Sequence, residues 1–504
     1  MRGLLIKLNM KDKLKDINIQ KAIEAASFFA VLACIYCSIK MNIVGRALWL
    51  DEAMLAMSVI KRNIFELCAS PLEWNQSAPV GYLLVIKLFE MFFGHSEAAL
   101  RIFSILSYIV LLVVFYYFVS KTIQMDFPML ATAGLANIAY LLEYSNMFKP
   151  YICDTLSVFL VLIVYYLYRE KKIRFLWLCV VYFILIWFSN PVAFMSGGVV
   201  AYEILNAILK KDSNKLKKGI VLGITIVVSF IIMYLVWLKP TLEATNLSDF
   251  WQGYQFPILI VNREILHNAL EAIKFVTVGI GPAWKIIIVL AALAVVINIF
   301  KIHNPYVWVL TFAAGLVLIA SNRGFFPMSD RLFLFSIPLL LYLAIFTATE
   351  VAKEVIKEKY VPVFIGILLL TFFMTGTGIE KYHTGEAYRP GEESTEALEF
   401  LKENVKADDL VYVYYPGVPV FQYKIGYNKT GMNGGKNNII YGEKFFYDNQ
   451  NPEDIELISN QDGIYIFFSH VVEYEPLDEL MNTLKEKGEL TSICGEYLYY
   501  YSKK

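Results

Sequence analysis

The chain has 504 residues, of which 57% are hydrophobic and 18% charged, and its formal net charge at pH 7 is zero. Its mean hydropathy is +0.52. Soluble proteins carry about 25% charged residues, and disordered chains are poor in the apolar residues that dominate here. The six cysteines are scattered rather than spaced as a disulfide framework. Composition therefore excludes a soluble enzyme, a disordered chain and a secreted disulfide scaffold, and it predicts a polytopic membrane protein.

Apolar runs recur along the first three quarters of the chain, each long enough to cross a hydrocarbon core of about 30 Å. Eleven transmembrane helices are predicted, at 22–40, 101–119, 128–145, 155–168, 173–190, 192–209, 219–238, 284–300, 305–320, 332–349 and 360–379. An odd number of spans places the two termini on opposite sides of the membrane.

Lysine and arginine are concentrated in alternate loops, which fixes the expected orientation. The basic loops are 1–21, 169–174, 210–218 and 353–359. The positive-inside rule assigns them to the cytoplasm. The outer loops are then 41–100, 146–154, 239–283 and 321–331. We therefore expect an integral protein of the cytoplasmic (plasma) membrane with its long loops outside.

Segment 78–94 is apolar but contains Lys87 and Glu90. Counting it as a span would invert every later loop. We expect it to be a helix that lies in the headgroup plane at the outer face.

From residue 380 the composition becomes mixed and polar, which predicts a separate soluble domain over 380–504 after a transmembrane domain over 1–379. Helical and strand-like patterns alternate in it, so a small α/β domain with a partly parallel sheet is expected outside the membrane. The predicted elements are a helix at 394–404, strands at 410–415 and 463–468, a helix at 476–488 and a strand at 497–501.

Asp51 and Glu52 are adjacent carboxylates in an otherwise apolar stretch at the outer boundary, where carboxylates are costly to desolvate. Such a pair suits abstraction of a proton from an alcohol. The alternative is that both residues cap the helix that follows. Asp154, at the start of the span after the next outer loop, has the same two interpretations.

Cationic residues at the same depth predict an anion site. Lys149 precedes Asp154 by five residues, and Arg331 closes the loop before the tenth span. An arginine there suits a lipid phosphate, which it can bind with two hydrogen bonds. Lys87 is a further candidate, and Tyr151 is expected beside the bound substrate. Snorkelling of each basic side chain to the interface is the alternative.

The order of three motifs, LWLDEAM, then APVGYLLVIKLFEMFFGHSEAALRIFS, then YSNMFKPYICD, resembles the membrane glycosyltransferases of the GT-C superfamily. More narrowly, it is similar to glycosyltransferase family 39, which holds protein O-mannosyltransferases and the bacterial aminoarabinose transferases that act on lipid A. The resemblance is clearest over residues 45–200. It implies inverting transfer of a sugar from a polyprenyl-phosphate donor to a glycan, lipid or protein acceptor at the outer membrane face, without a nucleotide sugar.

Carried over to this sequence, the resemblance implies that Asp51 is the general base or orients the acceptor, with Glu52 as its acidic neighbour. Asp154 matches the second acidic position of the family. Lys149 stands where many relatives have arginine, and Arg331 fits by location. The donor tail is expected in a groove between helices that is open to the bilayer.

No cofactor is expected. The five histidines are far apart in sequence, no His/Cys cluster has metal-ligand spacing, and no D-x-D motif accompanies them, so no metal site is predicted. A nucleic-acid partner is not expected either.

Two other functions remain open at this point. A polymerase or ligase of lipid-linked glycans has the same outer-face carboxylates and differs in the size of its donor. A lipid or solute transporter typically has repeated halves and ionisable residues near mid-membrane, and neither feature is evident in the predicted spans.

Overall fold

The computed structural model describes most of the chain. The described residues are 2–44, 46–245, 247–259, 261–385, 394–406, 408–425, 438–442, 452–470 and 477–504.

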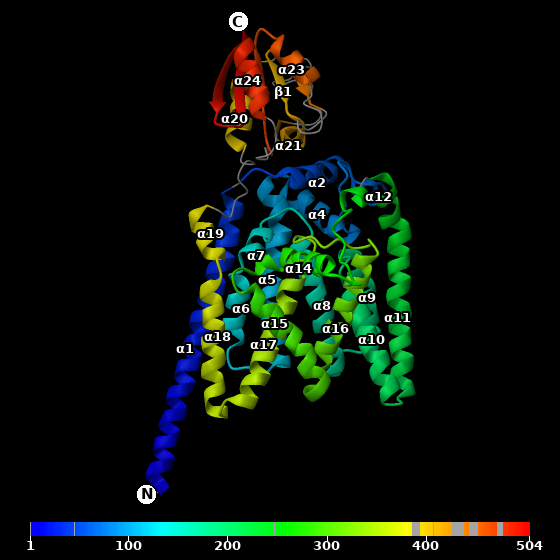
Figure 1. The fold of residues 1–504 in the computed structure, drawn as a ribbon, viewed down its shortest axis with the longest axis vertical. Coiled ribbons are helices and arrows are strands. Elements are labelled where there is room, and N and C mark those ends of the chain that lie inside the picture. The colour runs from blue at the N-terminus through cyan, green and yellow to red at the C-terminus, as the bar shows by residue number, and fades with distance from the viewer. Residues whose placement is uncertain are drawn as a thin grey trace.

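A bundle of long apolar helices forms the body of the molecule (Figure 1). Within the described residues nine helical stretches are long and apolar enough to cross a membrane, so the chain is a multi-pass membrane protein. They are built on α1 (Arg2–Ile43), α5 (Glu97–Thr122), α8 (Tyr151–Arg169), α10 (Val192–Leu209), α11 (Ser213–Met233), α15 (Trp284–Ile297), α16 (Pro305–Asn322), α17 (Ser336–Val355) and α18 (Val361–Thr375).

Two of the eleven predicted spans differ from a long continuous helix. The span predicted at 173–190 is the shorter helix α9 (Phe175–Phe188), and the one at 128–145 is divided into α6 (Pro128–Ala136) and α7 (Ala139–Tyr144). The break is at Asn137, whose amide group donates to the carbonyls of Phe373 and Gly376, both at 3.0 Å. Asparagine often exchanges helical hydrogen bonds for contacts of this kind.

Short helices cover the end of the bundle that carries the C-terminal domain (Figure 1). They are α2 (Leu50–Lys61), α3 (Ile64–Ala69), α4 (Val80–Phe93), α12 (Lys239–Ala244), α13 (Leu247–Phe250), α14 (Arg263–Thr277) and α19 (Gly378–Thr384). Single turns of other helix types are η1 (Tyr234–Leu238), η2 (Val278–Ile280), η3 (Asn298–Ile302), η4 (Glu358–Tyr360) and η5 (Tyr415–Gly417). Helix α4 corresponds to the segment predicted at the interface, and it is not among the helices long enough to span.

The N-terminus and the turns after α10 and α17 lie at the opposite end of the bundle (Figure 1). These are basic segments of the sequence, so the structure gathers them on one side, as the predicted orientation requires.

The C-terminal domain is a five-stranded mixed sheet with helices packed on it. Its strands are β1 (Leu410–Val413), β2 (Ile439–Tyr441), β3 (Ile464–Phe467), β4 (Gly488–Cys494) and β5 (Leu498–Lys503), and its helices are α20 (Thr395–Asn404), α21 (Val418–Ile425), α23 (Pro452–Ser459) and α24 (Leu477–Lys487). The strand order is β2-β1-β3-β5-β4. Strand β1 is parallel to β2 and β3, and β5 is antiparallel to β3 and β4. This confirms the predicted partly parallel sheet; residue 476, the predicted start of the last helix, lies outside the described residues.

Helix α21 docks the C-terminal domain onto the end of the bundle opposite the N-terminus, above α2 (Figure 1). Lys424 Nζ is 2.8 Å from Glu97 Oε1, and the Tyr423 hydroxyl donates to the carbonyl of His95. The ring of Tyr415 packs on that of Trp74 at 6.2 Å. The domain therefore sits directly over the loops that carry the candidate site.

Candidate functional site

The candidate site is built around the first turn of α2, where Asp51 and Glu52 point in different directions. Successive helical residues are about 100° apart around the axis. Glu52 therefore faces the protein interior and has no exposed surface, whereas the Asp51 side chain is 20% exposed. The capping interpretation holds only in part, since Glu52 Oε2 accepts a bond from the Trp49 amide at 3.2 Å.

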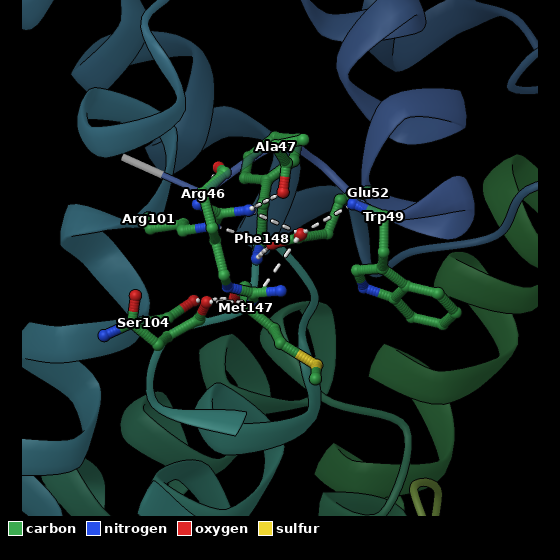
Figure 2. Close-up of polar contacts among 9 residues, drawn as sticks. Arg46, Ala47, Trp49, Glu52, Arg101, Ser104, Met147 and Phe148 are labelled. Atoms are coloured by element: carbon green, nitrogen blue, oxygen red, sulfur yellow. Dashed lines mark hydrogen bonds and ion pairs between the residues drawn. The ribbon is translucent and has the colours of Figure 1, made fainter. Parts of the chain in front are cut away.

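Glu52 is held by a buried hydrogen-bond network (Figure 2). Arg101, in the first turns of α5, donates to both carboxylate oxygens at 2.9 and 2.7 Å. The amide of Phe148 donates to Oε1, and Arg46 lies 3.8 Å from Oε2. Burial alone would raise the pKa of Glu52, but the charges of Arg101 and Arg46 and these hydrogen bonds outweigh it and lower the pKa to about 2. Glu52 is therefore ionised throughout the physiological range.

The same network fixes the segment that carries Lys149. Arg46 donates to the carbonyl of Asn146 at 2.8 Å, and Ser104 donates to that of Met147 at 2.6 Å. Together with the Phe148–Glu52 bond, these contacts tie three consecutive residues to α2, to the segment just before it and to α5. Lys149 follows immediately after Phe148, so its position depends on the buried ion pair that holds Phe148.

Asp51 pairs with Arg331, which lies 280 residues later in the chain. Arg331 Nη1 lies 2.6 Å from Asp51 Oδ2, and both side chains are 20% exposed. Asp330 accepts a bond from the Arg331 amide at 2.7 Å and another from the Tyr140 hydroxyl at 2.7 Å. The predicted convergence of these two residues on one site is thus seen directly.

Lys149 is buried beside this pair. Its ammonium donates to Gln76 Oε1 at 2.6 Å. Burial lowers the pKa of Lys149 to about 8; the charge of Asp51 opposes the shift and that of Arg331 adds to it. The site therefore brings the Asp51 carboxylate and two cationic groups within electrostatic reach of one another at the end of the bundle that carries the C-terminal domain.

Tyr151 and Asp154 lie on one face of the first turns of α8, because residues three apart are neighbours on a helix. Tyr151 is beside Arg331. Burial alone would lower the pKa of Arg331, but the neighbouring Tyr151 and Asp51 raise it. Asp154 is 8% exposed, and its Oδ1 has no hydrogen-bond partner among the described residues. The N-cap of α8 is Pro150 and no side chain caps it, so the capping interpretation of Asp154 is wrong.

Lys87 lies apart from this cluster. It is buried rather than snorkelling, and it donates to the carbonyl of Val59 at 2.9 Å and to Glu90 at 2.8 Å. No contact given by the described residues connects it to Asp51, Lys149 or Arg331.

Several site residues were missed by sequence reasoning. Arg101 opens a predicted span, and an arginine buried in an apolar helix was the available signal. Gln76 and the two tryptophans beside Arg331 carry no local pattern, since only the fold brings them there. The Arg331 Cζ lies 6.0 Å from the ring centre of Trp49 and 5.4 Å from that of Trp251.

An apolar cavity of about 830 Å³, counting its open side, lies between α15, α17 and α18. Its wall runs from Pro282 and Thr375, at the end of the bundle that carries the C-terminal domain, to Leu290 and Ala348 deeper in the bundle. Thr375 is the last residue of α18, and the Asn137 side chain binds the carbonyl of Gly376 that follows it. Three residues after Asn137, the Tyr140 hydroxyl binds Asp330. The described residues include no cluster of three or more His, Cys, Asp or Glu side chains able to hold a metal ion.

Solved structures of two membrane proteins share this fold. The apo structure of ArnT from Cupriavidus metallidurans aligns over 95% of this chain and 98% of its own length, with a TM-score of 0.53 and 11% identity. Bound to undecaprenyl phosphate it gives a TM-score of 0.55 at 12% identity, again over 95% of this chain and 97% of its own. The apo oligosaccharyltransferase from Archaeoglobus fulgidus gives 0.54 at 10% identity, over 95% of this chain and 74% of its own.

No protein-family model matches the sequence, and no curated protein sequence does. The described elements and these fold matches confirm the predicted architecture, a polytopic helical domain followed by a C-terminal α/β domain. Identities of 10 to 12% show the fold and carry no residue roles.

Proposed function

We propose that this chain is an inverting glycosyltransferase that moves a sugar from a polyprenyl-phosphate donor to an acceptor at the outer face of the plasma membrane. The observation that carries the proposal is the Asp51–Arg331 pair, 2.6 Å apart, with Lys149 beside it. A carboxylate suits the acceptor hydroxyl and two cations suit the donor phosphate. Their place at the outer end of a membrane bundle suits a substrate whose head is polar and whose tail is apolar.

Arg331 and Lys149 are the proposed phosphate ligands. As the glycosidic bond breaks, negative charge grows on the departing polyprenyl phosphate, and fixed cations there lower the barrier. Arg331 is able to exchange its bond to Asp51 for bonds to phosphate oxygens, since its side chain is partly exposed. Donor binding would then free Asp51 at the moment when a base is needed.

Asp51 is the proposed base. The acceptor oxygen forms a bond to the anomeric carbon, its proton passes to Asp51, and the bond from that carbon to the phosphate oxygen breaks with its electron pair on the polyprenyl phosphate. One displacement of this kind inverts the anomeric configuration. An acceptor that is itself a phosphate needs no base, and Asp51 would then orient it.

Asp154 is proposed as the second carboxylate of the site, and Tyr151 as a neighbour of the bound phosphate. Glu52 is given a different role from its neighbour. Because it is fully buried and permanently ionised, we assign it to positioning Lys149 and α2 rather than to proton transfer. Lys87 receives no role in binding, since its ammonium is engaged by Glu90 and Val59.

The apolar cavity between α15, α17 and α18 supports the proposed binding of a polyprenyl tail. Its wall is made of apolar side chains such as Ile286, Leu341 and Leu369, which suit an isoprenoid chain. We place the tail there with its phosphate directed toward the end of the bundle that carries Arg331. The acceptor, a glycan, lipid or protein of the cell envelope, would approach from beneath the C-terminal domain.

The test uses purified protein in proteoliposomes with radiolabelled polyprenyl-phosphate sugars, each offered alone and then with cell-envelope acceptors. Asp51→Asn and Asp154→Asn should lose transfer by about 10²-fold or more, while donor binding and monodispersity are retained. Glu73→Gln is the matched control, because this half-exposed carboxylate of the same outer loop pairs with Lys61 instead. Normal transfer by both aspartate variants would contradict the proposal. Consumption of lipid-linked oligosaccharides alone would indicate the polymerase or ligase alternative, and movement of donor across the bilayer without a product would indicate transport.

A further inference from the structure

The Arg331 guanidinium lies near two indole rings, one just before α2 and one just after α13. Trp49 is buried, 4% exposed, and lies two residues before Asp51. Trp251, 5.4 Å from Arg331 Cζ, follows α13 in the long outer loop and is half-buried. A cation–π contact of this kind stabilises the guanidinium. Part of the Trp251 side chain nevertheless stays exposed beside the site, where a ligand could contact it.

Trp251 packs against two aromatic rings of its own loop. The rings of Phe250 and Tyr254 meet it nearly at right angles, at 4.9 and 5.2 Å between centroids. The Tyr254 carbonyl accepts a bond from the Met328 amide at 2.7 Å, three residues before Arg331. This bond joins the segment that carries Trp251 to the loop that carries the guanidinium.

The position of the transferred sugar is confined by the groups already described. Its anomeric carbon is one oxygen atom away from the phosphorus that Arg331 would bind. The same carbon has to face the acceptor oxygen, which Asp51 would hold, and Asp51 is 2.6 Å from Arg331. A ring attached at that point would lie among the aromatic side chains around Arg331, which include Trp49 and Trp251.

We infer that the indole of Trp251 is the platform on which the sugar of the donor stacks, and that it selects a sugar without negative charge. The inference rests on the proposed function. An aromatic face offers a large, rigid apolar surface to the C–H face of a pyranose at low conformational cost. The charge preference follows because the phosphate occupies Arg331 and Lys149, leaving the carboxylates Asp51 and Asp154 to repel an anionic sugar.

The test compares two probes, undecaprenyl phosphate and undecaprenyl phosphate that carries glucose, mannose or galactose, binding to the protein in nanodiscs. Trp251→Ala should weaken binding of the sugar-bearing probe about tenfold relative to wild type, a loss of about 1.4 kcal/mol. Binding of undecaprenyl phosphate should stay within about twofold, a change of about 0.4 kcal/mol. Trp251→Phe should recover most of the loss, because it keeps an aromatic face.

Trp284→Ala is the matched control, because Trp284 also makes an indole–cation contact, with Lys285 at 5.6 Å, and should leave both probes unaffected. Equal losses for the two probes in Trp251→Ala would overturn the inference, since Trp251 would then act only through Arg331. Tighter binding of a probe that carries glucuronic acid would overturn the charge preference. If the wild type binds neither probe, the proposed function fails and the sugar platform fails with it.

Discussion

Replacing Glu52 by leucine removes the acceptor of four hydrogen bonds from the interior of the protein. Two come from Arg101 and one each from the amides of Trp49 and Phe148. Breaking a buried ion pair by removing one partner costs about 3–5 kcal/mol, and each buried amide left without a partner costs about 1–3 kcal/mol. The total of at least about 5 kcal/mol reaches the lower end of the ~5–15 kcal/mol that stabilises a native domain. We therefore expect Glu52→Leu not to accumulate in folded form.

Glu52→Gln separates the structural role of this residue from a chemical one. The amide oxygen keeps two of the four acceptor positions, while the NH2 group opposes two donors, so we expect a loss of about 3 kcal/mol. The assay is the thermal midpoint of the protein in detergent, followed by size-exclusion chromatography, with sugar transfer measured on the folded fraction. Glu73→Gln is the control, because its half-exposed carboxylate stays in contact with water and its loss leaves no fully buried charge unpaired, so the expected cost is smaller. Glu52→Gln with an unchanged midpoint and abolished transfer would refute the reasoning and return Glu52 to the reaction itself.

Three further predictions follow from other parts of the structure. Burial lowers the pKa of Lys149 to about 8, so its charge is present below that pH and is lost above it. The affinity for the donor should therefore fall as the pH rises through about 8, which a profile of KM against pH would measure. In Lys149→Arg the fall should move to higher pH. Gly198→Ala should lower the thermal midpoint by a loss of about 1–3 kcal/mol, because its Cβ would lie 2.5 Å from the Val309 carbonyl, whereas Gly315→Ala has open space and should not. Lys424→Glu should speed proteolytic release of the C-terminal domain, and adding Glu97→Lys should reverse the change if the 2.8 Å pair docks the domain.

Much of the fold was readable from the sequence because hydrophobic length and period report burial directly. The strands predicted at 410–415 and 463–468 are β1 and β3, and the terminal strand predicted at 497–501 is β5. Strand β4 was missed because Gly488, which suggested the end of a helix, is the first residue of a strand that begins immediately. The span predicted at 128–145 is broken because Asn137 has tertiary partners that hydropathy does not register.

The candidate site was predictable in its members more than in its contacts. Depth in the membrane placed Asp51, Lys149 and Arg331 together, because the positive-inside rule assigns every loop to one side. Nothing in the sequence paired Arg331 with Asp51 rather than with Asp154, since that choice depends on how α17 and α2 pack. Arg101 was counted within an apolar span, so the buried partner of Glu52 was not foreseen.

Asp51 and Glu52 have different roles because they are adjacent on a helix. Adjacent positions on a helix diverge by about 100°, so one carboxylate of the pair points inward when the other points to the site. The inward residue, Glu52, binds Arg101 and the Phe148 amide, and this fixes Lys149, the next residue. The outward residue, Asp51, meets Arg331. One helical turn therefore sets the distance between the proposed base and both proposed phosphate ligands, and loss of Glu52 should displace Lys149 even where Asp51 remains intact.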